Sequence, residues 1–240
     1  MSGHNKWSTI QQKKGVKDAK RGQIFTKYIK LITMAAKERG GDMKMNSTLR
    51  MLVAKAKKDN LPMEKIERAI KIGTGEIKSD VAIQEVLYEG YGPSGVALLI
   101  QVLTDNTNRA FASVRTILTK AGATLGKPGC VEYLFNKKGI FVFENVDTNA
   151  LEEFAILNGA EDIVNENSVM IVYTHPQDFH AFSEALSQSS FVPTHFELSY
   201  VPNTFVEGDE KIAEKIEHLV DLLEEDDDVH NVITNLKTSS

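Results

Sequence analysis

The chain is poor in cysteine and has no long apolar run. Cys130 is the one cysteine among 240 residues, which excludes an intramolecular disulfide and favours a reducing compartment. No segment approaches the ~18 apolar residues that a membrane-spanning helix needs. The N-terminal segment also lacks the apolar stretch of a signal peptide. The sequence therefore predicts a cytoplasmic protein, and we interpret Cys130 as a small buried side chain rather than a reactive thiol.

The common signatures of catalysis and metal binding are also missing. The histidines show neither HExxH nor paired zinc spacing, and the chain has no GxSxG motif. The acidic run at 224–230, EEDDDVH, lacks the ligand spacing of an EF-hand, so we interpret it as the solvated end of a helix. GYGPSG, at 90–95, lacks the GK[ST] ending of a P-loop and predicts a turn. We expect no enzymatic activity, no metal and no cofactor.

What the chain does have is a strong separation of charge. Residues 1–78 carry 19 Lys and Arg against 7 Asp and Glu, a net of +12, whereas residues 79–240 carry a net of −17. Exposed charges are screened beyond about 8 Å at physiological salt, so a polyanion bound to the first segment would hardly feel the acidic remainder. The basic segment can therefore bind nucleic acid although the whole chain is acidic.

Hydrophobic periodicity predicts a small bundle of three helices in the basic segment. The helical stretches are expected at 22–41, 46–59 and 62–72. Asn46 and Ser47 are good N-caps for the second helix, and Pro62 suits the first turn of the third. The inward positions are Ile24, Tyr28, Leu31, Ile32, Ala35, Leu49, Leu52, Val53, Ala56, Ile66, Ala69 and Ile70.

From about residue 80 the pattern changes to strands that alternate with helices. Helices are expected at 108–122, 148–159, 176–188 and 209–225. Strands are expected at 85–92, 95–104, 130–139, 139–145, 161–166, 168–174, 194–202 and 230–236, with a Lys-Lys-Gly turn at 137–139. The stretch from 139 to 202 then reads βαββαβ, which is the ferredoxin-like order.

These elements predict an α+β protein with three domains. The first, residues 1–78, is a basic helical domain. An α/β domain formed by 79–134 and 203–240 is expected to be discontinuous, because residues 135–202 form a complete ferredoxin-like unit inserted within it.

The strongest candidate site is the basic N-terminal segment, whose lysines surround the one tryptophan of the chain. Its candidate nucleic-acid contacts are Lys6, Trp7, Lys13, Lys14, Lys17, Lys20, Arg21, Lys27 and Lys30. Lysine favours phosphate contact over base reading, and an aromatic side chain among lysines suits stacking on an unpaired base. The alternative is a solvated basic tail, or one that docks on acidic parts of the same or a neighbouring chain.

The second helix adds three candidate lysines: Lys55, Lys57 and Lys58. These positions avoid the apolar face of the helix, so we expect them to be exposed. An ordinary solvated helix face is an equally good interpretation.

The motif TDNTNRA, residues 104–110, joins a strand end to a helix start. Several of its side chains can cap the helix. Arg109 falls in the first turn, where the helix dipole disfavours a cation. We favour structural capping here, with Arg109 marking either a salt bridge or an anion site.

The chain resembles the YebC family over nearly its full length. The resemblance rests on MSGHNKW, KKGVKDAKRGQIFTK, KIERAIKIGTGE, YGPSGVALLIQVLTDNTNRA, GATLGKPGCVEYLFNKKG and LVDLLEEDDDVHNV. It implies a cytoplasmic bacterial protein with an N-terminal helical bundle and two ferredoxin-like α/β domains, one partly inserted in the other. It also implies a DNA-binding transcriptional regulator, or a translation factor at the large ribosomal subunit, since mitochondrial relatives are translational activators.

Three functional hypotheses follow. The first is a DNA-binding transcriptional regulator, and the second is a factor bound to rRNA of the large ribosomal subunit that relieves stalling. The third is an interaction module whose acidic α/β domains bind a basic protein. We expect a nucleic acid as the main partner, and a monomer or weak oligomer.

Overall fold

A three-helix bundle opens the described part of the chain. The structure, a computed structural model, describes residues 19–78, 82–166 and 169–238. The bundle consists of α2 (Ala19–Arg39), α3 (Ser47–Lys58) and α4 (Met63–Gly73), and we call it the helical unit. The Asn46 side chain caps α3 by accepting a hydrogen bond from the Leu49 amide at 3.0 Å, as its sequence position predicts.

Most of the predicted core of the helical unit is buried. Leu31 and Ile70 are partly buried, whereas Ile24 is 44% exposed, so the prediction for Ile24 was wrong. The buried apolar face of α2 begins only at Tyr28. Before Tyr28, Phe25 is partly buried against the core, whereas Gln23 and Lys27 bind the end of α8 (Glu210–Glu224). The buried positions are Tyr28, Ile32, Ala35, Ala36, Leu49, Leu52, Val53, Ala56, Leu61, Ile66 and Ala69.

An antiparallel sheet with the strand order β3-β1-β2-β9 forms what we call the outer unit. Its strands are β1 (Gln84–Tyr91), β2 (Ala97–Thr104), β3 (Thr124–Leu125) and β9 (Val229–Thr234). The helices α5 (Thr107–Lys120) and α8 (Glu210–Glu224) cover one face, where their apolar side chains form a core with those of β2 and β9. The last strand of this sheet therefore comes from the far end of the chain.

A second antiparallel sheet, with the order β5-β6-β4-β7, forms the inserted unit. Its elements are β4 (Phe135–Glu144), α6 (Thr148–Leu157), β5 (Asp162–Glu166), β6 (Val169–Thr174), α7 (Phe179–Ser187) and β7 (His195–Pro202). The predicted βαββαβ order is confirmed, and the sheet has the strand arrangement of a ferredoxin-like fold. A short parallel pair, β8 (Val206–Gly208) with β10 (Leu236–Thr238), was not predicted.

The segment 130–139 differs from its prediction. It was expected to be a strand that turns at Lys-Lys-Gly, but it forms a 3-10 turn (Glu132–Leu134) and then enters β4 without a break. Glu89 is the reason for the turn, because its buried carboxylate accepts hydrogen bonds from the amides of Gly129, Val131 and Glu132. Those amides are therefore not available to a sheet.

Gly139 continues the strand because the neighbouring elements leave it no room for a side chain. A Cβ at this position would lie 2.3 Å from Thr174 Oγ1 and 2.8 Å from the Phe179 ring. The glycine is needed for this close approach and does not mark a turn.

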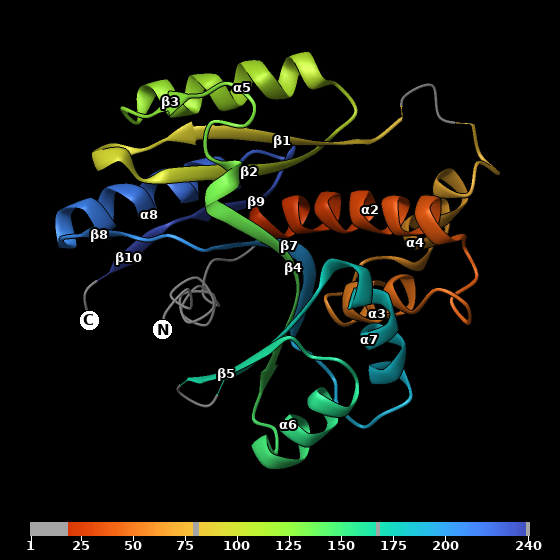
Figure 1. Cartoon of the computed structure of the whole chain (residues 1–240). Coiled ribbons are helices and arrows are strands. Elements are labelled where there is room, and N and C mark those ends of the chain that lie inside the picture. Colours follow the sequence, from red (N-terminus) through yellow and green to blue (C-terminus); the bar gives the residue numbers. More distant parts are fainter. Residues whose placement is uncertain (1–18, 79–81, 167–168, 239–240) are drawn as a thin grey trace.

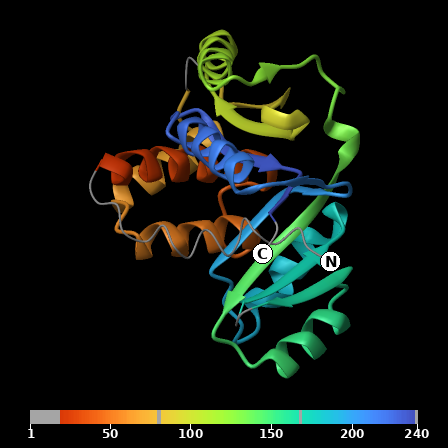
Figure 2. The same cartoon turned by 90° about the vertical axis from the view of Figure 1, so that its left-hand side faces the viewer.

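The helical unit and the inserted unit share one apolar core. Residues of α2 and α3 form a single buried cluster with Phe141, Phe179 and Phe182 of the inserted unit, and α3 packs on α7. Figures 1 and 2 show α2 between the outer unit and the inserted unit. The chain is thus an α+β protein with a helical bundle followed by two α/β units. That these units are domains with the predicted boundaries remains our proposal. In the described part of the chain, no helix is long and apolar enough to cross a membrane.

Candidate nucleic-acid interface

The structure describes only part of the predicted interface. Lys6, Trp7, Lys13, Lys14 and Lys17 lie outside the described residues. Lys20 and Arg21 belong to the first turn of α2, but their side chains are not among those described. The remaining candidates are Lys27, Lys30, Lys55, Lys57 and Lys58.

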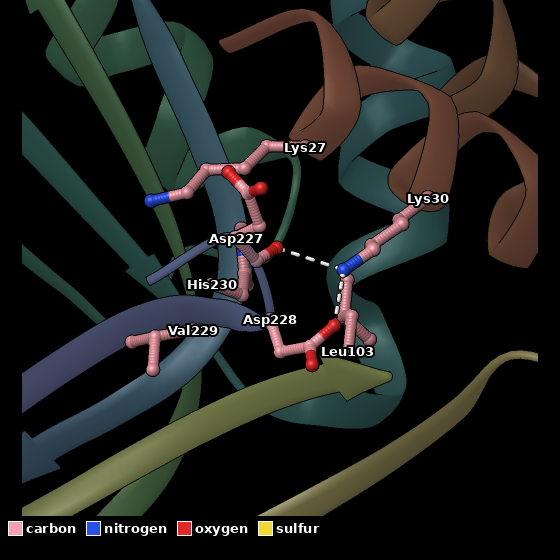
Figure 3. A pocket seen from close by; sticks show the side chains of 7 residues that line it. All are labelled: Lys27, Lys30, Leu103, Asp227, Asp228, Val229 and His230. Carbon is pink, nitrogen blue, oxygen red and sulfur yellow. Dashed lines mark hydrogen bonds and ion pairs between the residues drawn. The ribbon is translucent and has the colours of Figure 1, made fainter. Parts of the chain in front are cut away.

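Three side chains on one stripe of α2 bind the C-terminal end of α8 and the residues that follow it. Gln23 Nε2 donates to the Glu225 carbonyl at 2.8 Å, and Lys27 Nζ donates to the Glu224 carbonyl at 3.0 Å. One turn later, Lys30 Nζ donates to the Asp227 carbonyl and to Asp228 Oδ1, both at 2.7 Å. Figure 3 shows Lys30 pointing at both of these oxygens.

This contact satisfies groups that a helix end leaves open. The last carbonyls of a helix have no partner within it, and cations near them are favoured by the helix dipole. Burial lowers the pKa of the Lys27 ammonium, and the neighbouring Glu224, Asp227 and Asp226 oppose that effect. Since Lys30 also forms an ion pair, the two lysines are held by their own chain.

Asp228 joins two structural units. Its side chain is 6% exposed and binds both Lys30 and the Arg109 guanidinium, whose Nη2 lies 2.8 Å from Asp228 Oδ2. Burial alone would raise the pKa of Asp228, but the hydrogen bonds from Lys30 and Arg109 outweigh it and lower the pKa. Arg109 also pairs with Asp105 at 2.6 Å.

The TDNTNRA motif therefore has the structural role that we favoured. Asn106 caps α5 by accepting a hydrogen bond from the Arg109 amide at 3.0 Å. Of the two interpretations of Arg109, the structure has the salt bridge, since its guanidinium binds Asp105 and Asp228.

The prediction that the acidic run is a solvated helix end was wrong for part of it. Glu225 and Asp227 are exposed, but Asp228 is buried and Asp226 accepts a hydrogen bond from Ser113 of α5. Sequence alone did not indicate this, because its partners on α2 lie about two hundred residues earlier.

A shallow pocket lies where α2 meets β9. It is lined by Lys27, Lys30, Leu103, Asp227, Asp228, Val229 and His230 (Figure 3). Its empty space is about 140 Å³, open solvent included, which is well below the ~300–1,000 Å³ of small-molecule sites. The two lysines already fill it with ion pairs and hydrogen bonds, so the pocket does not indicate a cofactor site.

The three lysines of α3 have different environments. Lys57 and Lys58 are exposed, as predicted. The prediction was wrong for Lys55, which is partly buried because α3 packs on the inserted unit. Its Nζ lies 3.4 Å from His195 Nδ1 of β7, and burial lowers its pKa.

A polar cluster between the inserted unit and the outer unit was not predicted. Glu197 of β7 lies at its centre, with His195 Nε2 at 3.6 Å and His230 Nε2 at 3.8 Å from one carboxylate oxygen. Asn231 of β9 donates to its other oxygen at 3.0 Å and also contacts Gln101 and Ser199. Each strand taken alone shows only an alternation of apolar and polar residues. The sequence therefore did not indicate the cluster, because its members come together only when the two sheets pack.

The remaining motifs carry structural roles. The GYGPSG run has GxGxxG spacing, but it joins the antiparallel strands β1 and β2 and does not lead from a strand into a helix, as dinucleotide binding requires. Cys130 was predicted to be a buried side chain, but it is only partly buried; burial raises the pKa of its thiol, with a further contribution from Glu89. Among the described residues, no group of His, Cys, Asp and Glu side chains could hold a metal ion.

Comparison with known proteins matches almost the whole chain. The profile of the TACO1/YebC N-terminal domain matches residues 5–76, and that of the TACO1/YebC second and third domains matches residues 83–236. The chain belongs to the TACO1/YebC family. The resemblance inferred from the sequence is confirmed.

Relatives in this family have regulatory names. A protein of Treponema denticola is 51% identical over 239 residues, which are 99% of this chain and 96% of that protein. One from Geotalea uraniireducens is 48% identical over 240 residues, or 100% of this chain and 97% of that protein. Both are named probable transcriptional regulatory proteins.

A solved structure has the same fold. The crystal structure of a conserved hypothetical protein from Aquifex aeolicus superimposes with a TM-score of 0.83 at 39% sequence identity. The match covers 93% of each chain.

Proposed function

We propose that this TACO1/YebC protein is a non-enzymatic, cytoplasmic regulator of gene expression that binds the phosphate backbone of a nucleic acid through its basic N-terminal segment. The observation that carries the proposal is the charge separation, +12 in residues 1–78 against −17 in the remainder. Clustered lysines supply sequence-independent attraction to phosphates. The names of the relatives favour DNA and transcription as the setting.

The proposed contacts divide into two groups by their environment. Lys27, Lys30 and Lys55 have partners within the chain, so they are the less accessible group. The primary contacts are Lys6, Trp7, Lys13, Lys14, Lys17, Lys20, Arg21, Lys57 and Lys58.

Charge reversal tests this proposal. The triple variant Lys13→Glu/Lys14→Glu/Lys17→Glu is expected to lose affinity for labelled duplex DNA. Its log–log salt slope should fall by about one unit for each lost phosphate contact. The matched control is Arg115→Glu/Lys120→Glu/Lys127→Glu, which makes the same charge change on exposed residues of the outer unit. An equal loss of DNA affinity in both variants would mean that only the net charge of the protein matters, and it would refute the assigned site.

A ribosomal target is the second candidate, favoured by the predominance of lysine over base-reading side chains in the segment. Two measurements separate the candidates. A transcriptional regulator should hold a promoter fragment against excess random duplex, whereas a ribosomal factor should co-sediment with large subunits at moderate salt. Absence of the folded protein from subunit fractions at low salt would exclude the ribosomal role.

A further inference from the structure

The contact between α2 and the outer unit is polar. It consists of Gln23, Lys27 and Lys30 on one side and residues 224–228 on the other, and we call it the clasp. The buried cluster that contains α2 continues into the inserted unit. The cluster between the outer sheet and its helices contains no residue of α2, and neither does the cluster that joins the outer sheet to Phe135 of the inserted unit. Ions and hydrogen bonds, rather than a shared apolar core, therefore hold α2 to the outer unit.

The acidic side of the clasp is held in place without α2. Arg109 binds Asp228, and Ser113 donates a hydrogen bond to Asp226. Both belong to α5, in the same unit as the acidic segment. Asp226 in turn accepts from the Asp228 amide at 2.9 Å. The segment can thus release α2 and keep its own conformation.

The lysine side of the clasp is satisfied by the groups that a phosphate chain also offers. Lys30 Nζ is bound by a carbonyl oxygen and a carboxylate oxygen, and Lys27 Nζ by a carbonyl oxygen beside several carboxylates. Phosphate oxygens are acceptors of the same kind and form strong charge-assisted hydrogen bonds with ammonium groups. Residues 224–228, EEDDD, are acidic in succession; Glu224, Asp226 and Asp227 act on Lys27, and the Asp228 carboxylate binds Lys30.

We propose that residues 224–228 act as an internal polyanion that occupies Lys27 and Lys30 in the unbound protein, and that nucleic acid displaces these residues as the clasp opens. This inference rests on the proposed function. It assigns the clasp a regulatory role, since the two lysines add their contacts only in the open state. Binding then needs enough phosphates to outcompete the internal acidic segment.

A reversible cross-link tests the clasp. In a Cys130→Ser background, Gln23→Cys and Glu225→Cys are joined by a bismaleimide that contains a reducible disulfide, which locks the clasp closed. The probes are a labelled random-sequence 24-base-pair DNA duplex and labelled poly(U). Reduction of the linker should tighten binding of the duplex about tenfold and raise its salt slope by about two, one contact for each released lysine.

The outcomes separate the two proposals. A cross-link between Thr116→Cys and Thr119→Cys, two exposed positions on α5, is the matched control, and its cleavage should change nothing. Equal binding before and after cleavage of the clasp linker overturns the inference and leaves the proposed function standing. No binding of either probe in either state refutes both. Tighter binding by the locked form also overturns the inference.

Discussion

Lys30 and Arg109, which belong to different structural units, bind the same carboxylate, that of Asp228, at 2.7 Å and 2.8 Å. One partner lies on α2 and the other on α5. The carboxylate and Lys30 are mostly buried, so their ion pair is shielded from screening by salt, whereas Arg109 is 54% exposed. Asp228 therefore connects the position of the helical unit to that of the outer unit.

Removal of the Asp228 charge should destabilise the protein. The variant Asp228→Asn leaves Lys30 without its ionic partner in a mostly buried site, so we expect a loss of about 2 kcal/mol in the free energy of unfolding. Urea denaturation at neutral pH measures it. The control is Asp227→Asn, whose side chain is exposed and should change stability little. An equal effect of both substitutions would contradict the specific role of Asp228.

The ion pairs of Asp228 predict that the stability of the protein depends on pH. The pKa of Asp228 is lowered from its ordinary 3.8 in the folded protein, so its stabilising contribution is complete above that value and is lost as the pH falls below it. We expect the stability difference between the wild type and Asp228→Asn to be constant from about pH 5 to 8 and to shrink below about pH 4. Denaturation curves across this range measure it, and a difference that grows in acid would refute the assignment.

The Glu89 carboxylate should stabilise the outer unit, because it accepts hydrogen bonds from three backbone amides. Burial would raise the pKa of its carboxyl group, but the amides of Val131, Gly129 and Glu132 donate to it and lower the pKa. Glu89→Gln replaces one acceptor oxygen with a donor that faces these amides, at an expected cost of about 1–3 kcal/mol. Glu85→Gln, at an exposed position of the same strand, is the control for urea denaturation, and it should behave like the wild type.

Two glycine-to-alanine substitutions should change the free energy of unfolding in opposite directions. Gly139→Ala places a methyl group against Thr174 and Phe179 and should cost about 1–3 kcal/mol through overpacking. Gly22→Ala adds a methyl group to an exposed helical position with no atom within 4 Å, so a gain of about 0.5–1 kcal/mol is expected. Thermal unfolding followed by circular dichroism tests both. A neutral Gly139→Ala would show that β4 can shift to accommodate a side chain.

The exposed end of α3 should contribute to nucleic-acid binding without involving the clasp. Lys57→Glu/Lys58→Glu is expected to lower the salt slope for duplex DNA by up to about two, because both side chains are free to meet phosphates. Lys120→Glu/Lys127→Glu makes the same charge change on the outer unit. If fluorescence anisotropy shows the same slope for the α3 variant as for the wild type, these lysines are not contacts.

Sequence was sufficient where local chemistry decides the structure. Asn46 was recognised as a potential cap, and so was the TDNTNRA motif as a whole, because short polar side chains before an amphipathic stretch commonly cap a helix. The ferredoxin-like order followed from alternating strand and helix patterns. The strand order β5-β6-β4-β7 and the antiparallel pairing come from the structure, and both agree with that fold.

Sequence was insufficient where a partner lies far away along the chain. Nothing in the lysine spacing of α2 indicates that Lys27 and Lys30 meet carbonyls nearly two hundred residues later. Lys55 avoids the apolar face of its helix, yet it is partly buried by another unit. The Lys-Lys-Gly turn was predicted from composition, because the close approach of Thr174 to Gly139 cannot be read from neighbouring residues.

The strand order of the outer sheet sets an order of assembly during synthesis. β2 receives β9 from residues 229–234 as its neighbour, and α8 closes the same face. The bundle and the inserted unit are complete by residue 202. A nascent chain can therefore finish two of its three parts early, whereas the outer sheet keeps an open edge beside β2 and an apolar face that α5 covers only in part until α8 and β9 emerge.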